Sequence, residues 1–185
     1  PPRSTPLYSS AASDVYKRQE QIGSRFSKMG SDSELKSISL KELVDRQSAY
    51  LKKRLPLLKK EIELTVSGID NISIEGNEIL LGWAIENVIR NGIDSIQSEE
   101  GKVDISISSD DVSGIIQIQD NGAGILKKDW KNIFRPGFST KERGWGLGLS
   151  LVNRIINEIH DGEIKVLDSK IGFGTCFEIR IKKSA

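Results

Sequence analysis

Hydrophobic and polar positions repeat with two different periods along this chain. Segments with an aliphatic residue at every third or fourth position, typical of an amphipathic helix, are 39–56, 75–96 and 147–160. Segments in which apolar and polar residues alternate, typical of a half-buried strand, are 62–66, 103–107, 114–119 and 175–181, and a further strand is expected around Val166. We also expect a short helix at 127–134 and a loop at 135–143.

The order of these elements predicts the fold class. One helix is followed by a strand, a second helix by two strands, and a third helix by two more strands. Elements that are apolar on one side must bury that side against another layer. We therefore expect an α+β protein built as a two-layer sandwich, in which helices cover one face of a mixed sheet.

Capping signals mark the ends of two of these helices. Ser39 and Glu42 have the spacing of a capping box, and Pro56 lies where the first helix is expected to end. Gly162 follows the third helix, at a usual position for a terminating glycine.

The first 38 residues lack this regularity. Residues 1–19 are rich in Ser, Pro and Ala, so we expect a disordered tail, and 10–19 also resemble translated sequencing-adaptor sequence, which would make them a scar. We interpret residues 20–38 as the remnant of an upstream helix or a linker, and residues 39–185 as one domain.

Composition excludes several classes of partner. Lys plus Arg (27) nearly equal Asp plus Glu (26), so no overall field favours nucleic acid or direct contact with an anionic membrane. No apolar run approaches the roughly 20 residues of a membrane span, and we see no charged-then-apolar leader. We expect a cytoplasmic location for this part of the protein, and membrane association of the parent protein stays open. Cys176 is the only cysteine, and we expect an ordinary buried thiol.

The string Asp120-Asn121-Gly122-Ala123-Gly124 carries the first candidate chemistry. It follows a predicted strand, its glycines allow the backbone to approach a flat ligand, and its carboxylate can accept a hydrogen bond from an exocyclic amine. The alternative is a β-hairpin, because Asp-Asn-Gly after alternating apolar residues is a common hairpin signal.

A second candidate is the glycine run Gly144, Gly146 and Gly148, which opens the third helix. A glycine-rich turn at a helix N-terminus presents backbone N–H groups and the positive end of the helix dipole to an anion, which suits phosphate. The spacing matches neither a P-loop nor a Rossmann motif, because Leu149 stands where the third glycine would be. A flexible glycine hinge is the alternative.

Asn87 and Asn91 form a third candidate on the second helix. They are four residues apart and therefore share one helix face. Their amide oxygens suit a hard cation such as Mg²⁺, which also binds nucleotide phosphates. Two solvent-exposed asparagines are the alternative.

These three motifs, together with Gly172-Phe173-Gly174-Thr175, resemble the ATP-binding catalytic domain of sensor histidine kinases, within the gyrase, Hsp90, histidine kinase and MutL superfamily. The resemblance covers about residues 39–183 and implies the Bergerat ATP-binding fold. The motifs that carry it are the N box at 86–91, the G1 box at 120–124, the F box at 134–138, the G2 box at 144–148 and the final glycine motif at 174–175.

The resemblance also implies roles for individual residues. Asp120 would bind the adenine amino group, Asn91 the magnesium ion, and Lys141 the phosphates, with Asn87, Asn91 and Lys141 as the catalytic residues. The full set expected to bind ATP with Mg²⁺ is Asn87, Asn91, Asp120, Gly122, Gly124, Ile125, Lys141, Gly144, Gly146, Leu147, Gly148 and Thr175.

One position favours histidine as the phosphate acceptor. ATPases and serine kinases of the superfamily usually carry a glutamate, which acts as general base, four residues before the metal asparagine. This chain has Asn87 at that position. The neighbouring Glu86 is rotated from it by about 100 degrees around the helix axis, so we expect that it does not take the place of that base. A neutral imidazole needs no such base. An ATPase and a regulatory nucleotide-binding module without transfer activity are the alternatives.

The acceptor itself is not expected within this chain. Its only histidine, His160, lies at a helix C-terminus, where an imidazole usually caps carbonyls or faces water. The resemblance therefore implies a catalytic fragment of a histidine kinase whose acceptor lies on a helical dimerisation domain, of which residues 20–38 would be a remnant. The expected further partner is the receiver domain of a response regulator, which would take the phosphoryl group from the phosphohistidine.

Overall fold

The computed structural model describes residues 34–58, 61–139 and 146–184. Its strands are β1 (Lys36–Ser39), β2 (Glu61–Gly68), β3 (Ser73–Gly76), β4 (Glu100–Ser109), β5 (Ser113–Asp120), β6 (Glu163–Lys170) and β7 (Gly174–Lys182). Its α-helices are α2 (Leu40–Lys52), α3 (Glu78–Ser95) and α4 (Gly148–Asn153). Shorter elements are the 3₁₀ turns η1 (Leu55–Leu58), η2 (Lys127–Asp129) and η3 (Asn132–Phe134), and the π-helix η4 (Arg154–Ile159).

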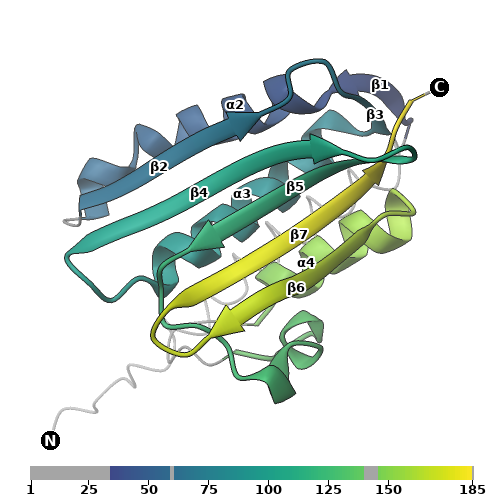
Figure 1. The fold of residues 1–185 in the computed structure, drawn as a ribbon. Helices are drawn as coiled ribbons and strands as arrows, with labels where there is room; N and C mark the ends of the chain where they lie inside the picture. The colour runs from purple at the N-terminus through teal and green to yellow at the C-terminus, as the bar shows by residue number, and fades with distance from the viewer. Residues whose placement is uncertain (1–33, 59–60, 140–145, 185) are drawn as a thin grey trace, which may run out of the picture. The chain divides into compact units, whose positions relative to one another are not determined.

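The main sheet has five strands in the order β2-β4-β5-β7-β6. β2 pairs with β4 in parallel, and the other three pairings are antiparallel, so the sheet is mixed. Figure 1 shows α2, α3 and α4 together behind this sheet, with the opposite face of the strands turned to the viewer. The predicted two-layer α+β sandwich is confirmed.

The core lies between the sheet and the helices. Alternate residues of the strands point into it, including Ile105, Ile116 and Ile118, and α3 adds Leu81, Ile85 and Ile89, all of which are fully buried. Cys176 is buried as expected, and burial raises the pKa of its thiol to about 11. Among the described residues, no helix is both long and apolar enough to cross a membrane.

A second, two-stranded sheet was not predicted. β1 pairs with β3 in antiparallel register, and Ile74 of β3 also forms an isolated bridge with Lys183, just after β7. Residues 36–38, interpreted above as linker or remnant, therefore pair with a strand of the described fold. Four residues are too few for a recognisable alternation, which is why the pattern of apolar positions did not show this strand.

The predicted starts of two helices have different outcomes. α2 begins as expected, because the Ser39 side chain accepts a hydrogen bond from the Glu42 N–H. The second predicted helix was placed three residues too early, since α3 begins at Glu78 rather than Glu75. Asn77 sets this start, because its side-chain oxygen accepts from the N–H groups of Ile79 and Leu80.

Two other predicted helices differ in form from the expectation. The segment 127–134 is not one helix but the two 3₁₀ turns η2 and η3, consistent with the marginal stability of short isolated helices. The helix predicted at 147–160 consists of α4 continued by the π-helix η4. It closes where the Gly162 N–H donates to the Ile156 carbonyl (2.9 Å).

Candidate functional site

Asp120 is the last residue of β5, a central strand, and its side chain points toward the helix layer. Only 3% of the residue is exposed. Its Oδ1 accepts hydrogen bonds from the Ser95 hydroxyl (3.1 Å) and from the Gly122 N–H (2.8 Å). The chain after Asp120 continues into η2 instead of returning as a strand, and β5 pairs with β4 and β7. The hairpin interpretation of this string is therefore wrong.

Glycines bring three segments close to Asp120. A Cβ at Gly92 of α3 would lie 3.2 Å from the Asp120 Cβ, and a Cβ at Gly122 would lie 1.9 Å from the Ser95 hydroxyl. Gly174 is the most constrained, because its φ is +111° and a Cβ there would lie 1.8 Å from the Asp120 carbonyl oxygen. A side chain at Gly174 is incompatible with this packing.

Thr175 and the loop after Asp120 are tied together by a residue that we did not predict. Thr175 is buried, and its hydroxyl lies 2.9 Å from that of Ser169 on β6. The Ser169 hydroxyl also accepts from the Ile125 N–H (2.8 Å). A single serine near the end of a strand carries no sequence signal that could have identified it. We call Asp120, Gly122, Ser169, Gly174 and Thr175 the carboxylate cluster.

Gly124 lies between Gly122 and Ile125 in this loop and contacts the turn that joins β6 to β7. Its φ is +75°, and a Cβ there would lie 2.2 Å from the Lys170 carbonyl oxygen. On the same turn, the Gly172 N–H donates to the Ala123 carbonyl (2.8 Å). The predicted residues Gly122, Gly124 and Ile125 thus lie together beside the ends of β5, β6 and β7.

Asn87 and Asn91 lie on one face of α3, and both are half-buried. The Asn87 amide nitrogen donates to the Trp83 carbonyl (2.8 Å), which fixes the direction of the side chain. Its Oδ1 lies beside the start of α4, 3.5 Å from where a Cβ on Gly148 would be. The structure therefore brings the predicted asparagine face and the predicted glycine run together.

The glycine run also packs against the segment after η3. Gly146 has a φ of +63°, and a Cβ there would lie 2.5 Å from the Phe138 carbonyl oxygen. The Gly137 N–H donates to the Gly146 carbonyl (3.2 Å), and Leu147 then precedes α4. We call Asn87, Asn91, Gly146, Leu147 and Gly148 the amide cluster. Lys141 and Gly144 lie outside the described residues.

Two charged or titratable residues that could compete for a catalytic role are already engaged. Glu86 pairs with Arg90 one turn along α3. His160 is 3% exposed, its Nε2 accepts from the Asn77 N–H (2.9 Å), and its Nδ1 donates to the Ile155 carbonyl (2.7 Å). Burial lowers the pKa of His160, and the Ile155 carbonyl raises it to a lesser degree. As expected for a helix C-terminus, this imidazole binds a carbonyl.

The described residues offer amide oxygens, and no cluster of carboxylates or imidazoles, as ligands for a metal. The described residues contain no group of three or more His, Cys, Asp or Glu side chains placed to bind a metal ion. The amide cluster offers the side-chain oxygens of Asn87 and Asn91, a type of ligand that suits Mg²⁺, because this ion keeps several waters and takes further ligands from phosphates.

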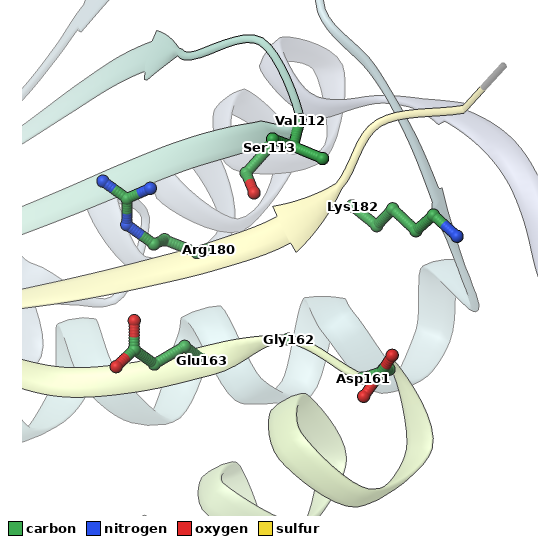
Figure 2. Close-up of a pocket in the computed structure, with 7 residues that line it drawn as sticks. All are labelled: Val112, Ser113, Asp161, Gly162, Glu163, Arg180 and Lys182. Carbon is green, nitrogen blue, oxygen red and sulfur yellow. The ribbon is translucent and has the colours of Figure 1, made fainter.

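A pocket of about 330 Å³ lies at the opposite end of the strands, near the start of β5 and β6 and the end of β7. Figure 2 shows Arg180, Lys182 and Glu163 along its walls. The Arg180 guanidinium is bound by Asp110 (2.6 Å) and by Glu178 (2.9 Å). Because β5 runs from this pocket to Asp120, the pocket is separate from the carboxylate cluster. None of its lining residues belongs to the amide cluster, and we assign it no role in nucleotide binding.

Comparison with known proteins gives a consistent result. The profile of the family described as "Histidine kinase-, DNA gyrase B-, and HSP90-like ATPase" matches residues 76–185. The chain is 34% identical over 144 residues to sporulation kinase C of Bacillus subtilis (strain 168), covering 78% of this chain and 33% of that protein. It is 31% identical over 181 residues to sporulation kinase D of the same strain, covering 97% of this chain and 35% of that protein.

Solved structures show the same fold. The mycobacterial sensor histidine kinase MprB superposes with a TM-score of 0.70 at 24% identity, covering 80% of this chain and 97% of that one. Histidine kinase ThkA, crystallised in complex with the response regulator protein TrrA, superposes with a TM-score of 0.73 at 19% identity, covering 98% of this chain and 53% of that one. The chain spans only about a third of the length of the sporulation kinases C and D.

Proposed function

We propose that this chain, which belongs to the family of histidine kinase-, DNA gyrase B- and HSP90-like ATPases, donates the γ-phosphate of ATP to a histidine on another domain. Membership of the family implies that the chain binds ATP. The kinase activity of the whole protein, its magnesium ion and its partners are parts of the proposal.

The observation that carries this proposal is the position of α3 between two glycine motifs. Gly92 of α3 packs on Asp120, and the Asn87 Oδ1 lies beside Gly148 at the start of α4. One helix thus links a buried carboxylate, which suits an adenine amino group, to a glycine run that suits phosphates. A single adenine nucleotide would contact both clusters.

We assign the residues of the amide cluster to positioning and charge neutralisation. Asn91 would hold Mg²⁺ through its amide oxygen, and Asn87 would orient the phosphates. The bound ion would neutralise charge that develops on the transferring phosphoryl group. Catalysis by this chain would therefore depend on holding ATP in line with an acceptor. Lys141 is proposed as a further phosphate ligand.

Transfer to histidine is favoured over hydrolysis by the surroundings of Glu86. The position four residues before Asn91 is Asn87, which cannot act as a general base. The Glu86 carboxylate is already paired with Arg90. His160 is a poor acceptor, because it is buried and both ring nitrogens are hydrogen-bonded. The acceptor is therefore proposed to be a histidine of a helical dimerisation domain.

The proposed pathway continues to a response regulator. ThkA, which shares this fold, was crystallised with the response regulator protein TrrA. We propose that the phosphohistidine made with this chain passes its phosphoryl group to a receiver domain, and that the reaction occurs in the cytoplasm. Within the chain, residues 1–19 are proposed to be a tail or scar, residues 20–38 a remnant of the dimerisation domain or a linker whose last residues pair with β3, and residues 39–185 the catalytic domain.

The test combines this chain with a separately produced dimerisation domain from its own parent protein and with ATP labelled at the γ-phosphate. The expected result is acid-labile label on the dimerisation domain and none on this chain. Loss of the label when the acceptor histidine is replaced by alanine would confirm its position. Tight ATP binding with no label on the partner would instead favour the regulatory module.

A further inference from the structure

Ser169 joins three segments of the carboxylate cluster through one hydroxyl group. It lies next to the last residue of β6, directly opposite Thr175 of β7 in the antiparallel register. Its Oγ is 3.0 Å from the Gly174 carbonyl, 2.9 Å from the Thr175 hydroxyl and 2.8 Å from the Ile125 nitrogen.

A β-bulge directs Ser169 to this position. The register of β6 against β7 shifts between Val166 and Asp168, so that Leu167 is the extra residue. Val166 points into the core, and regular alternation would turn residue 169 to the opposite face. The bulge reverses the alternation and places Ser169 on the same side as Thr175, as bulges beside functional sites often do.

The three bonds of Ser169 determine the direction of the bond to Thr175. A serine hydroxyl has one proton and two lone pairs. The proton is donated to the Gly174 carbonyl, and one lone pair accepts from the Ile125 N–H. The bond with Thr175 must then use the remaining lone pair, so the Thr175 hydroxyl donates to Ser169. The Thr175 oxygen is left to act as an acceptor toward any ligand.

Asp120 lies across from Thr175 at the ends of the neighbouring strands β5 and β7. Gln119 is paired with Cys176, and Gly174 packs on the Asp120 backbone. An ionised carboxylate can only accept hydrogen bonds. The carboxylate cluster therefore presents two acceptors, which suit an amino group and repel a carbonyl oxygen.

We propose that Ser169 is a specificity-determining positioning residue that holds the Thr175 hydroxyl as an acceptor, so that the site selects a purine with a 6-amino group over one with a 6-carbonyl group. The inference rests on the proposed binding of ATP. Without Ser169, the Thr175 hydroxyl can rotate and donate its proton to a carbonyl oxygen. The loss of Ser169 then affects the choice of base more than the binding of phosphates.

The test measures the affinities of the full chain for ATP and for inosine triphosphate by calorimetry, in the wild type and in Ser169→Ala. ATP and inosine triphosphate share the ribose and the three phosphates, and inosine carries a carbonyl group at position 6. We expect Ser169→Ala to lower the ratio of the two affinities by about three- to tenfold, the size of one neutral hydrogen bond. Ser169→Thr retains the hydroxyl and should keep the ratio within about twofold of the wild type.

Two controls separate this role from a structural one. Ser106→Ala removes an exposed hydroxyl from β4 and should leave both affinities unchanged. In a Thr175→Val background, Ser169→Ala should not change the ratio further. An equal fall in both affinities, which the unpaired Ile125 N–H alone could cause, would overturn the assignment while leaving nucleotide binding intact. A wild-type chain that binds neither nucleotide would overturn the proposed function itself.

Discussion

The carboxylate cluster and the amide cluster are built in different ways. In the carboxylate cluster, several hydrogen bonds fix the side chains and the backbone. Its glycines, such as Gly174, are packed so closely that they leave no room for a Cβ. In the amide cluster, Gly146 is also constrained by its positive φ and its packing on Phe138, but the Asn87 side chain is held by one bond to its own helix, and a Cβ on Gly148 would meet only ordinary contact. Under the proposed function, recognition of the base would depend on a preorganised sheet edge, whereas binding of the phosphates would depend on what the ligand and its metal add.

The sharpest way to disrupt the carboxylate cluster is a side chain at Gly174. Gly174→Ala should lower the free energy of unfolding by about 2 to 6 kcal/mol, because it adds both backbone strain and a clash with the Asp120 carbonyl. Chemical denaturation measures the loss. The matched control is Gly172→Ala, whose φ is also positive (+78°) but which has nothing within 4 Å of the added Cβ. Equal losses in the two variants would show that the close packing of Gly174 contributes nothing.

Substitutions in the amide cluster should change the stability of the fold much less than those in the carboxylate cluster, but they should abolish most of the phosphoryl transfer. Asn91→Ala should reduce phosphoryl transfer by at least about a hundredfold, since a bound metal ion contributes several kcal/mol to such reactions. Its thermal unfolding should stay close to that of the wild type, because alanine is favourable in a helix. ATP binding measured across a magnesium titration checks the mechanism, and identical curves for variant and wild type would exclude Asn91 as a metal ligand.

A third prediction compares the clusters on binding alone. Asp120→Asn should weaken ATP binding roughly tenfold or more, because it replaces an acceptor with an amide whose donor faces the adenine amino group or leaves a buried group unpaired. Calorimetry provides the measurement, and Asp168→Asn, at an exposed position of β6, is the matched control. Unchanged affinity in Asp120→Asn would remove Asp120 from the site.

The smallest expected effect concerns His160, whose ring binds Asn77 at the start of α3 and Ile155 of η4. The pKa of His160 is lowered in the folded protein, chiefly by burial. As the pH falls below about 6.5, His160 therefore binds a proton in the unfolded chain before it does so in the folded protein. The contribution of this buried ring to the free energy of unfolding is present above that pH and is lost between it and the lower pKa of the folded state. His160→Gln should show a flatter fall in melting temperature over pH 7 to 5. A parallel fall in both proteins would mean that other groups control the acid response.

The sequence predicted the parts of the site that depend on local pattern. The strand that ends at Asp120 and the asparagine face of α3 follow from periodicity, and the glycine run at 144–148 was placed at the start of a helix, where Gly148 does begin α4. Ser169 could not be predicted in this way, because its position depends on a bulge in β6 that only the pairing with β7 reveals. The same holds for β1, which exists as a strand only through its pairing with β3.

Some features were wrongly predicted because tertiary contacts decide them. Alternation did not predict β3, so the predicted start of α3 fell within that strand, at Glu75, whereas in the structure Asn77 caps the helix. The continuous helix expected at 147–160 takes a π-helical form over Arg154–Ile159, where the His160 ring binds the Ile155 carbonyl and the Asn77 N–H. That link joins residues 83 positions apart, which no local pattern reports.

The central claim, that this site holds ATP for transfer to histidine and not for hydrolysis, is tested most directly by following the γ-phosphate. Labelled ATP is incubated with the chain alone and with the added dimerisation domain, and free phosphate and acid-labile protein-bound label are measured in each case. We expect slow phosphate release by the chain alone and transfer of label to the added domain. Rapid phosphate release by the chain alone, abolished in Glu86→Ala, would contradict the account and identify Glu86 as the general base of an ATPase.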